Sequence, residues 1–204
     1  MARVDDYINA KKLAAEELAK ESLDEIAKRS GYDKTGTDQL RVSFLDRIYI
    51  LSWPGFEFKD EAFENKEVPI QEQVIILHYL MAKFPGNKTE QWISFREIPG
   101  ASFYFSAFVK RAIDPLKNVF GKDIALFAKA AGCLNGNAID AGDAGFEFKL
   151  FPFVSLQLVL WEGDEEFTPE ANILFQDTIG DIFLPEDVAW LSGMLVYRLV
   201  ALSR

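Results

Sequence analysis

An arginine among aromatic residues is the pattern in this sequence that most clearly suggests chemistry. Arg96 follows Trp92 by four positions and precedes Tyr104 by eight. A planar guanidinium can stack on aromatic rings or hold a carboxylate through two parallel hydrogen bonds. Lys110 and Arg111, two turns along the helix expected next, would extend such an anion site. The pattern predicts a ligand-binding site, and the alternative is that Arg96 pairs with a carboxylate of the acidic surface.

The single histidine, His78, is a second candidate. It follows Leu77 at the edge of an apolar helical pattern. Such a residue could be an axial ligand to a tetrapyrrole metal or a general base, and the alternative is a hydrogen-bonded structural histidine. With His78 and Cys133 as its only histidine and cysteine, the chain cannot supply a tetrahedral zinc site or a four-thiolate cluster. No metal site is predicted from these residue types.

Four carboxylates follow the most apolar expected strand, in Glu162-Gly-Asp-Glu-Glu166. Carboxyl groups at a strand end can exchange protons with a substrate or bind a hard cation. Glu162, Asp164 and Glu165 are therefore candidate acid/base residues. The spacing does not match a calcium-binding loop, and the alternative is an acidic turn that is simply solvated.

The composition narrows the class of protein. The net charge of −10 repels phosphate backbones, so we expect no nucleic-acid binding. The most apolar stretch, Val188 to Leu202, is shorter than a bilayer span and contains Arg198, so we expect no membrane segment. An acidic start and a single cysteine favour a cytoplasmic protein. The 18 Phe and four Trp residues favour a large aromatic core or pocket.

The hydrophobic patterns favour one α+β domain, in which antiparallel β-hairpins pack against core helices and both ends of the chain are helical. Residues 1–30 are expected to form an N-terminal surface helix ended by Gly31, and residues 38–204 the α+β body. Alternating apolar residues predict strands; these lie near residues 40–44, 48–51, 56–58, 146–150 and 154–161.

Helical spacing and proline positions predict the remaining elements. The expected core helices span residues 69–84, 105–120 and 123–131. Pro115 predicts a kink, or a new helix at Asp114. Thr168-Pro169 is typical of a helix start, and so is Leu184-Pro185, where the terminal helix should begin.

Several of these segments, taken in order, resemble an uncharacterised family known only as a domain of unknown function. The segments are Val68–Leu80, Trp92–Ile98, Phe103–Phe105 with Asp114-Pro115, and Leu160–Phe167 with Pro169–Asn172. The resemblance covers residues 40 to 202 and implies a protein of anaerobic bacteria or archaea. Some family members carry an iron–sulfur module, but this chain lacks the cysteines for a cluster. The resemblance therefore implies a redox or iron–sulfur partner protein for any role in electron transfer.

Together these observations favour a cytoplasmic accessory or cofactor-binding protein of anaerobic metabolism. By analogy with the family, the ligand expected near Arg96 is a planar anionic cofactor such as a corrinoid or haem. One alternative is an enzyme that uses Glu162, Asp164 or Glu165 on an anionic substrate held by Arg96. A second alternative is a protein–protein interaction module that presents its N-terminal or C-terminal helix.

Overall fold

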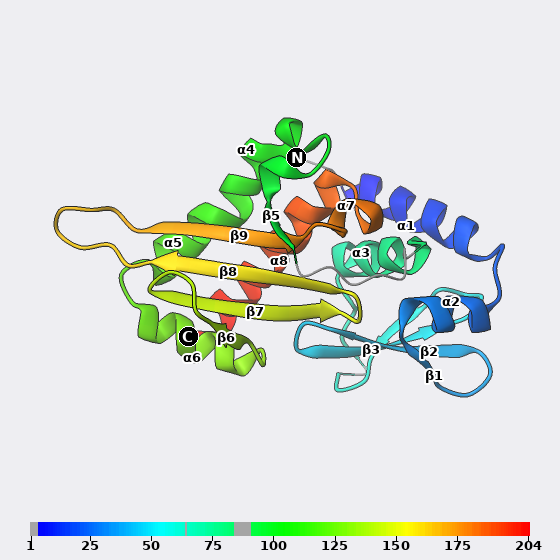
Figure 1. Cartoon of the computed structure of the whole chain (residues 1–204). Helices are drawn as coiled ribbons and strands as arrows, with labels where there is room; N and C mark the ends of the chain where they lie inside the picture. The colour runs from blue at the N-terminus through cyan, green and yellow to red at the C-terminus, as the bar shows by residue number, and fades with distance from the viewer. Residues whose placement is uncertain (1–3, 64, 84–90) are drawn as a thin grey trace. The chain divides into compact units, whose positions relative to one another are not determined.

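Two antiparallel sheets and the helices beside them make up the fold in a computed structural model, which describes residues 4–63, 65–83 and 91–204 (Figure 1). The chain forms two compact units. Unit 1 comprises residues 1–86 with 151–153, and unit 2 comprises residues 87–150 with 154–204. The α+β class, the antiparallel hairpins and the helical ends are confirmed. That the whole chain acts as one domain stays a prediction.

The N-terminal segment forms two helices, α1 (Val4–Leu18) and α2 (Leu23–Ser30), so the single helix expected there is wrong. Ser22 interrupts it as an N-cap, because its side chain accepts the N–H of Glu25 while the Glu25 carboxylate accepts the N–H of Ser22. Gly31 ends α2 at φ 75°, and its N–H donates to the carbonyl of Ala27. This left-handed conformation is one that glycine adopts without steric cost.

Unit 1 contains a four-stranded sheet in the order β1-β2-β3-β4. Its strands are β1 (Asp33–Lys34), β2 (Gln39–Phe44), β3 (Arg47–Ser52) and β4 (Phe58–Asp60). The predicted alternation is confirmed in β2, where Leu40, Val42 and Phe44 are fully buried.

The core of unit 1 forms where its sheet and helices meet residues of the β7–β8 turn. Helix α3 (Ile70–Met81) begins after Pro69, as predicted, and the expected end at Phe84 lies outside the described residues. The ring of Tyr79 stacks on Phe151 with centroids 4.3 Å apart, and Phe44 contacts Phe151 at 5.1 Å. The Tyr79 hydroxyl donates to the carbonyl of Ser30 at 2.8 Å, so α3 is tied to α2.

Unit 2 begins with a short strand and a long, irregular helical run. Strand β5 (Trp92–Ser94) leads into the 3-10 turns η1 (Phe95–Glu97) and η2 (Ala101–Tyr104). The helical run then consists of α4 (Phe105–Phe108), a π-helical turn η3 (Val109–Ile113) and α5 (Asp114–Phe120). The new segment expected at Asp114 is confirmed. The wide π turn precedes Pro115, whose ring and missing N–H do not fit a regular α-helix.

A five-stranded antiparallel sheet in the order β5-β9-β8-β7-β6 forms the framework of unit 2. Besides β5, its strands are β6 (Asn137–Ile139), β7 (Ala144–Phe151), β8 (Val154–Trp161) and β9 (Glu170–Gln176). The helix start expected at Thr168-Pro169 is wrong, because strand β9 begins at Glu170 and pairs with Trp161 of β8. Pro169 packs against Gly121 and Gly163, at the base of the β8–β9 loop.

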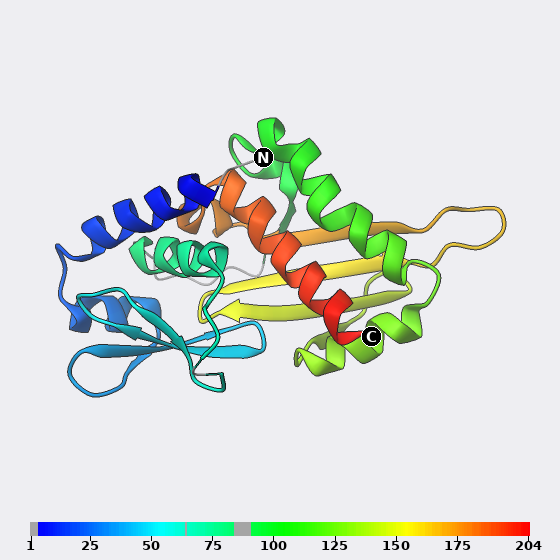
Figure 2. The same ribbon diagram turned by 180° about the vertical axis from the view of Figure 1, so that it is seen from behind.

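The helices α4–α5, α6 (Ile124–Cys133) and α8 (Pro185–Leu202) cover one face of this sheet (Figures 1 and 2). A short helix, α7 (Ile179–Ile182), joins β9 to α8. The sheet residues Leu158, Ile173 and Phe175 are fully buried. Among the described residues, no helix has the length and apolar character needed to cross a membrane.

Candidate functional site

Arg96 is exposed on the turn η1, and its guanidinium lies over the ring of Phe105, 3.6 Å from the ring centroid. The neighbouring Glu97 is engaged elsewhere, because its carboxylate accepts the backbone N–H of Ser94 at 2.7 Å. The hydrogen bonds from Ser94 lower the pKa of Glu97. Within the described ranges no carboxylate lies at salt-bridge distance from Arg96. Among the described residues, Arg96 therefore does not form the surface ion pair that was its alternative role.

Two more aromatic residues lie on the adjoining turn η2, which packs against η1 and α4. Phe103 is 85% exposed and meets Tyr104 edge to face, with centroids 5.1 Å apart. A phenylalanine this exposed is unusual, because it keeps most of its apolar surface in water. We call Arg96, Phe103, Tyr104 and Phe105 the arginine–aromatic surface.

Buried aromatic rings hold this surface in place. Phe95, which precedes Arg96, is 1% exposed and stacks on Phe108 of α4 with centroids 4.2 Å apart and planes inclined by 3°. Phe175 of β9 meets Phe95 edge to face at 6.2 Å. The turn that carries Arg96 is thereby attached both to the helix and to the sheet.

The other predicted cations lie further along the helical run. The guanidinium of Arg111 lies 4.2 Å from the ring of Trp190 on α8, while Lys110 is exposed. Gly193 of α8 lies close to the backbone of Arg111, so this arginine helps to join η3 to α8. Arg111 therefore has a packing role that the sequence pattern did not indicate.

The remaining predicted ligand-binding residues lie apart from Arg96. In the backbone register of β5 and β9, Trp92 lies opposite Gln176, and the next pair along the strands is Ile93 opposite Phe175. Since Phe175 faces α4, Trp92 points to the opposite face of the sheet. His78 is half-buried on α3, in unit 1. Arg96 and Tyr104 are thus the two predicted residues that share the arginine–aromatic surface.

The three candidate acid/base residues, Glu162, Asp164 and Glu165, are all exposed on the β8–β9 loop. Asp164 accepts the backbone N–H groups of Glu166 and Phe167, and these bonds lower its pKa. A carboxyl group with a lowered pKa is ionised near neutral pH and is a poor proton donor. The loop follows the pair Trp161–Glu170, whereas the strand that leads to Arg96 pairs with residues 174–176 at the other end of β9.

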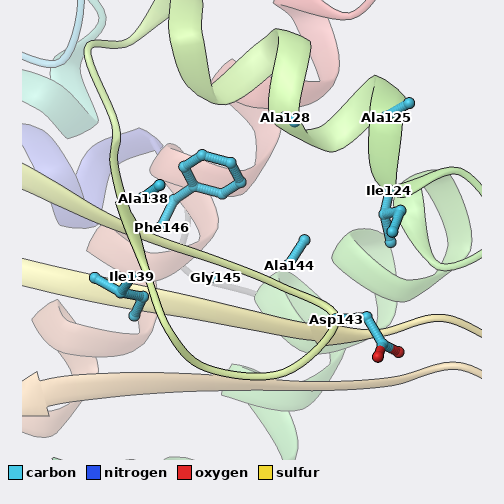
Figure 3. A pocket seen from close by; sticks show the side chains of 9 residues that line it. All are labelled: Ile124, Ala125, Ala128, Ala138, Ile139, Asp143, Ala144, Gly145 and Phe146. Atoms are coloured by element: carbon cyan, nitrogen blue, oxygen red, sulfur yellow. The ribbon is translucent and has the colours of Figure 1, made fainter.

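A pocket of about 420 Å³ lies between α6 and the β6–β7 hairpin (Figure 3). Most of its lining is apolar and small, including Ala125 and Ala128 of α6 and Ala144 of β7. Its one charged residue, Asp143, turns its carboxylate away from α6 in Figure 3 and accepts the N–H of Glu162 at 2.8 Å. None of the predicted site residues lines this pocket.

Sequence reasoning missed the parts that Phe103 and Phe105 play. Both residues belong to a run of phenylalanines whose spacing does not distinguish core rings from surface rings. The signal that could have separated them is the pair Pro99-Gly100, since a turn there interrupts the helical pattern. No group of three or more His, Cys, Asp or Glu residues that could hold a metal ion is found within the described ranges.

A family model described as "Domain of unknown function (DUF3786)" matches residues 22–198. The chain belongs to this family. The resemblance seen in the motifs is thereby confirmed as far as membership of a family of unknown function. No curated protein and no solved structure matches the chain.

Proposed function

We propose that this protein is an accessory protein that binds an acidic segment of a partner protein through the arginine–aromatic surface. The observation that carries the proposal is Arg96, which is exposed, stacked on Phe105 and without a carboxylate at salt-bridge distance among the described residues. A guanidinium left in this state can hold an external carboxylate through two parallel hydrogen bonds, and it is this local contact that must outweigh the repulsion from the net charge of −10. Arginine and aromatic side chains are also the residues most enriched at binding hot spots.

Exposure favours a protein partner over a small cofactor at this surface. A cofactor is usually enclosed by its site, whereas Phe103 and Tyr104 lie on an exposed turn. The exposed Leu184, at the start of α8, adds apolar surface in unit 2. A corrinoid or haem remains the proposed small ligand, and its carboxylate or phosphate groups would contact Arg96.

The partner that we propose is the redox or iron–sulfur protein that the resemblance implies, in the cytoplasm of an anaerobic organism. An acidic segment with an aromatic side chain would suit the surface, because its carboxylate could take both parallel N–H groups of Arg96. Its ring would cover Phe103 and remove apolar area from water. The alternative of acid/base catalysis has weaker support, because Glu162, Asp164 and Glu165 lie on a separate, exposed loop.

Site-specific photo-crosslinking in the native cells tests this proposal. A photoreactive phenylalanine analogue at position 103 should give one dominant adduct, which mass spectrometry of the crosslinked peptide identifies. Tyr197, which is 57% exposed on α8, is the matched control position. We expect the adduct at 103 to disappear when Arg96 is changed to Ala and to persist at low salt with Arg96→Lys. Equal crosslinking at 103 and 197, or an adduct insensitive to Arg96→Ala, would overturn the proposal.

Hemin is the probe for the small-ligand version. If a planar anion binds at Arg96, hemin should quench tryptophan fluorescence saturably and Arg96→Ala should weaken its binding by about tenfold, the equivalent of one good charge-assisted interaction. Unchanged affinity in Arg96→Ala would remove Arg96 from any such site.

A further inference from the structure

The helices α4–α5, α6 and α8 lie on one face of the five-stranded sheet (Figures 1 and 2). The opposite face carries a second group of side chains. The register of the strands identifies them, because residues directly opposite each other in a sheet point to the same side. Gln157 is opposite Leu174, and Trp92 is opposite Gln176. Asn172 lies two positions before Leu174 on the same strand. We call these five half-buried residues the amide face.

Two of the three amides on this face have a fixed orientation. The Oε1 atom of Gln176 accepts the backbone N–H of Ser155 at 3.0 Å, and the Oδ1 atom of Asn172 accepts the N–H of Ile173 at 2.9 Å. A backbone N–H can only donate, so the amide oxygen must face it. The NH₂ groups of Asn172 and Gln176 are consequently turned away from these bonds and can donate to a ligand.

The amide face has a tryptophan at one end and a wall at the other. Trp92 lies beside Gln176, whereas the loop before β7 covers Val159, which is 2% exposed. A Cβ atom on Gly142 of this loop would lie 2.7 Å from Val159 Cγ1, so the loop rests directly on β8. Asp143 holds the loop there, because its N–H donates to the carbonyl of Leu160 at 2.9 Å.

On β8 and β9, the side chains between the wall and Trp92 carry no charge. Gln157, Asn172 and Gln176 offer amide donors and acceptors, and Leu174 offers an apolar spot between them. A patch without charged side chains offers no group that could form an ion pair with a charged ligand. The ligand that suits it is neutral, rich in hydrogen-bond acceptors and donors, and has an apolar face to cover an aromatic ring.

We propose that the amide face binds a neutral oligosaccharide. The C–H face of one sugar ring would lie against Trp92, where it excludes water from the indole. Hydroxyl groups of that sugar and the next would accept hydrogen bonds from the NH₂ groups of Gln176 and Asn172. They would also donate to the amide oxygen of Gln157 or accept from its NH₂ group. From Gln176 to Asn172 the strand spans roughly 13 Å, at about 3.3 Å per residue, which accommodates a short oligosaccharide.

This site is separate from the arginine–aromatic surface, so the two proposals can fail independently. Trp92 and the amides point to one face of the sheet, while Phe105 packs with Phe95 and Phe108 on the helix side. Tyr197→Ala is therefore a matched control, since it removes an exposed ring of α8 outside both surfaces.

The experiment is a screen of the full chain on an array of neutral hexose and N-acetylhexosamine oligosaccharides, followed by calorimetric titration of the tetrasaccharides that bind. We expect Trp92→Ala to weaken binding by about tenfold, as expected for loss of one stacking contact. Gln157→Ala should weaken it several-fold, and Tyr197→Ala should leave the affinity unchanged. Circular dichroism of each variant checks that the fold is retained.

Three results would overturn the proposal. The first is an array on which no neutral oligosaccharide binds. The second is binding that Trp92→Ala and Gln157→Ala both leave unchanged, which would place the sugar elsewhere on the chain. The third is binding confined to anionic glycans and abolished by salt, because that pattern indicates a cationic site rather than a neutral amide face.

Discussion

Replacing Phe95 by alanine tests the anchoring of the arginine–aromatic surface. Phe95 is 1% exposed, stacks on Phe108 at 4.2 Å and meets Phe175 at 6.2 Å. Truncating a buried phenylalanine costs about 3–5 kcal/mol. Its aromatic pairs with Phe105, Phe108 and Phe175 are lost with it, so we expect a value near the upper end, about 4–5 kcal/mol. This is a large share of the roughly 5–15 kcal/mol that stabilises an ordinary domain.

Guanidinium denaturation followed by tryptophan fluorescence measures this loss. Trp53 belongs to unit 1, so a Trp53→Phe background leaves reporters that all lie in unit 2, at positions 92, 161 and 190. The matched control is Phe103→Ala, which makes the same chemical change eight positions later at a residue that is 85% exposed. A surface substitution of this kind should change stability by no more than about 0.5 kcal/mol.

The difference between these two variants is the critical quantity. If Phe95→Ala lost less than about 1 kcal/mol, Phe95 would not be a core residue and the reasoning about its stacking would be refuted. A loss from Phe103→Ala as large as that from Phe95→Ala would mean that Phe103 is buried in solution. That result would also remove the basis for a docking surface at η2.

Three further predictions concern the backbone and the loops. Gly31→Ala should cost roughly 1–3 kcal/mol in thermal or chemical unfolding, because φ is 75° and the new Cβ would lie 2.9 Å from Pro152 Cβ. The pKa of Asp164 is lowered from its ordinary 3.8, so its two hydrogen bonds stabilise the turn above pH 3.8 and are lost as the pH falls through the folded pKa. The amide NMR shifts of Glu166 and Phe167 should follow this titration. In Asp164→Asn, which cannot titrate at this position, the same shifts should not change over that pH range. Asn172→Ala should promote self-association, measured by light scattering. Strand β5 pairs with residues 174–176 of β9, and the variant leaves the Ile173 N–H beyond this pairing without its acceptor, so that this edge can pair with another chain. An unchanged monomer fraction would contradict this.

Local patterns predicted most elements of the fold. The alternation in β2 and β8, the proline at the start of α8 and the helix segment that begins at Asp114 each depend on residues close in sequence, so the pattern contains the whole signal. The break between α1 and α2 departs from the expected single helix because residues 4–29 contain helix formers without Pro or Gly, although Ser22 with Glu25 is a recognisable capping box.

Tertiary pairing decided the elements that the sequence did not predict. Thr168-Pro169 has the local signature of a helix start, but the alternating burial of Ile173 and Phe175 and the pairing with β8 make the segment a strand. The candidate site depended on such pairing too. Trp92 and Arg96 are four residues apart, yet Trp92 faces away from the helices on which Phe105 lies, because β5 pairs with β9 in one particular register.

Unit 1 is completed by residues that come much later in the chain. Phe151, which stacks on Tyr79 and contacts Phe44, is the last residue of β7 and is therefore synthesised after β5 and β6 of unit 2. On the ribosome, the first 86 residues therefore emerge before the Phe151 ring that packs against Tyr79 and Phe44 in their core has been made. We expect a nascent chain stopped near residue 90 to be more sensitive to protease than one stopped well beyond residue 153. We therefore expect the amino-terminal unit to reach its full stability only after the β7–β8 turn has been synthesised, while the sheet of unit 2 is being made.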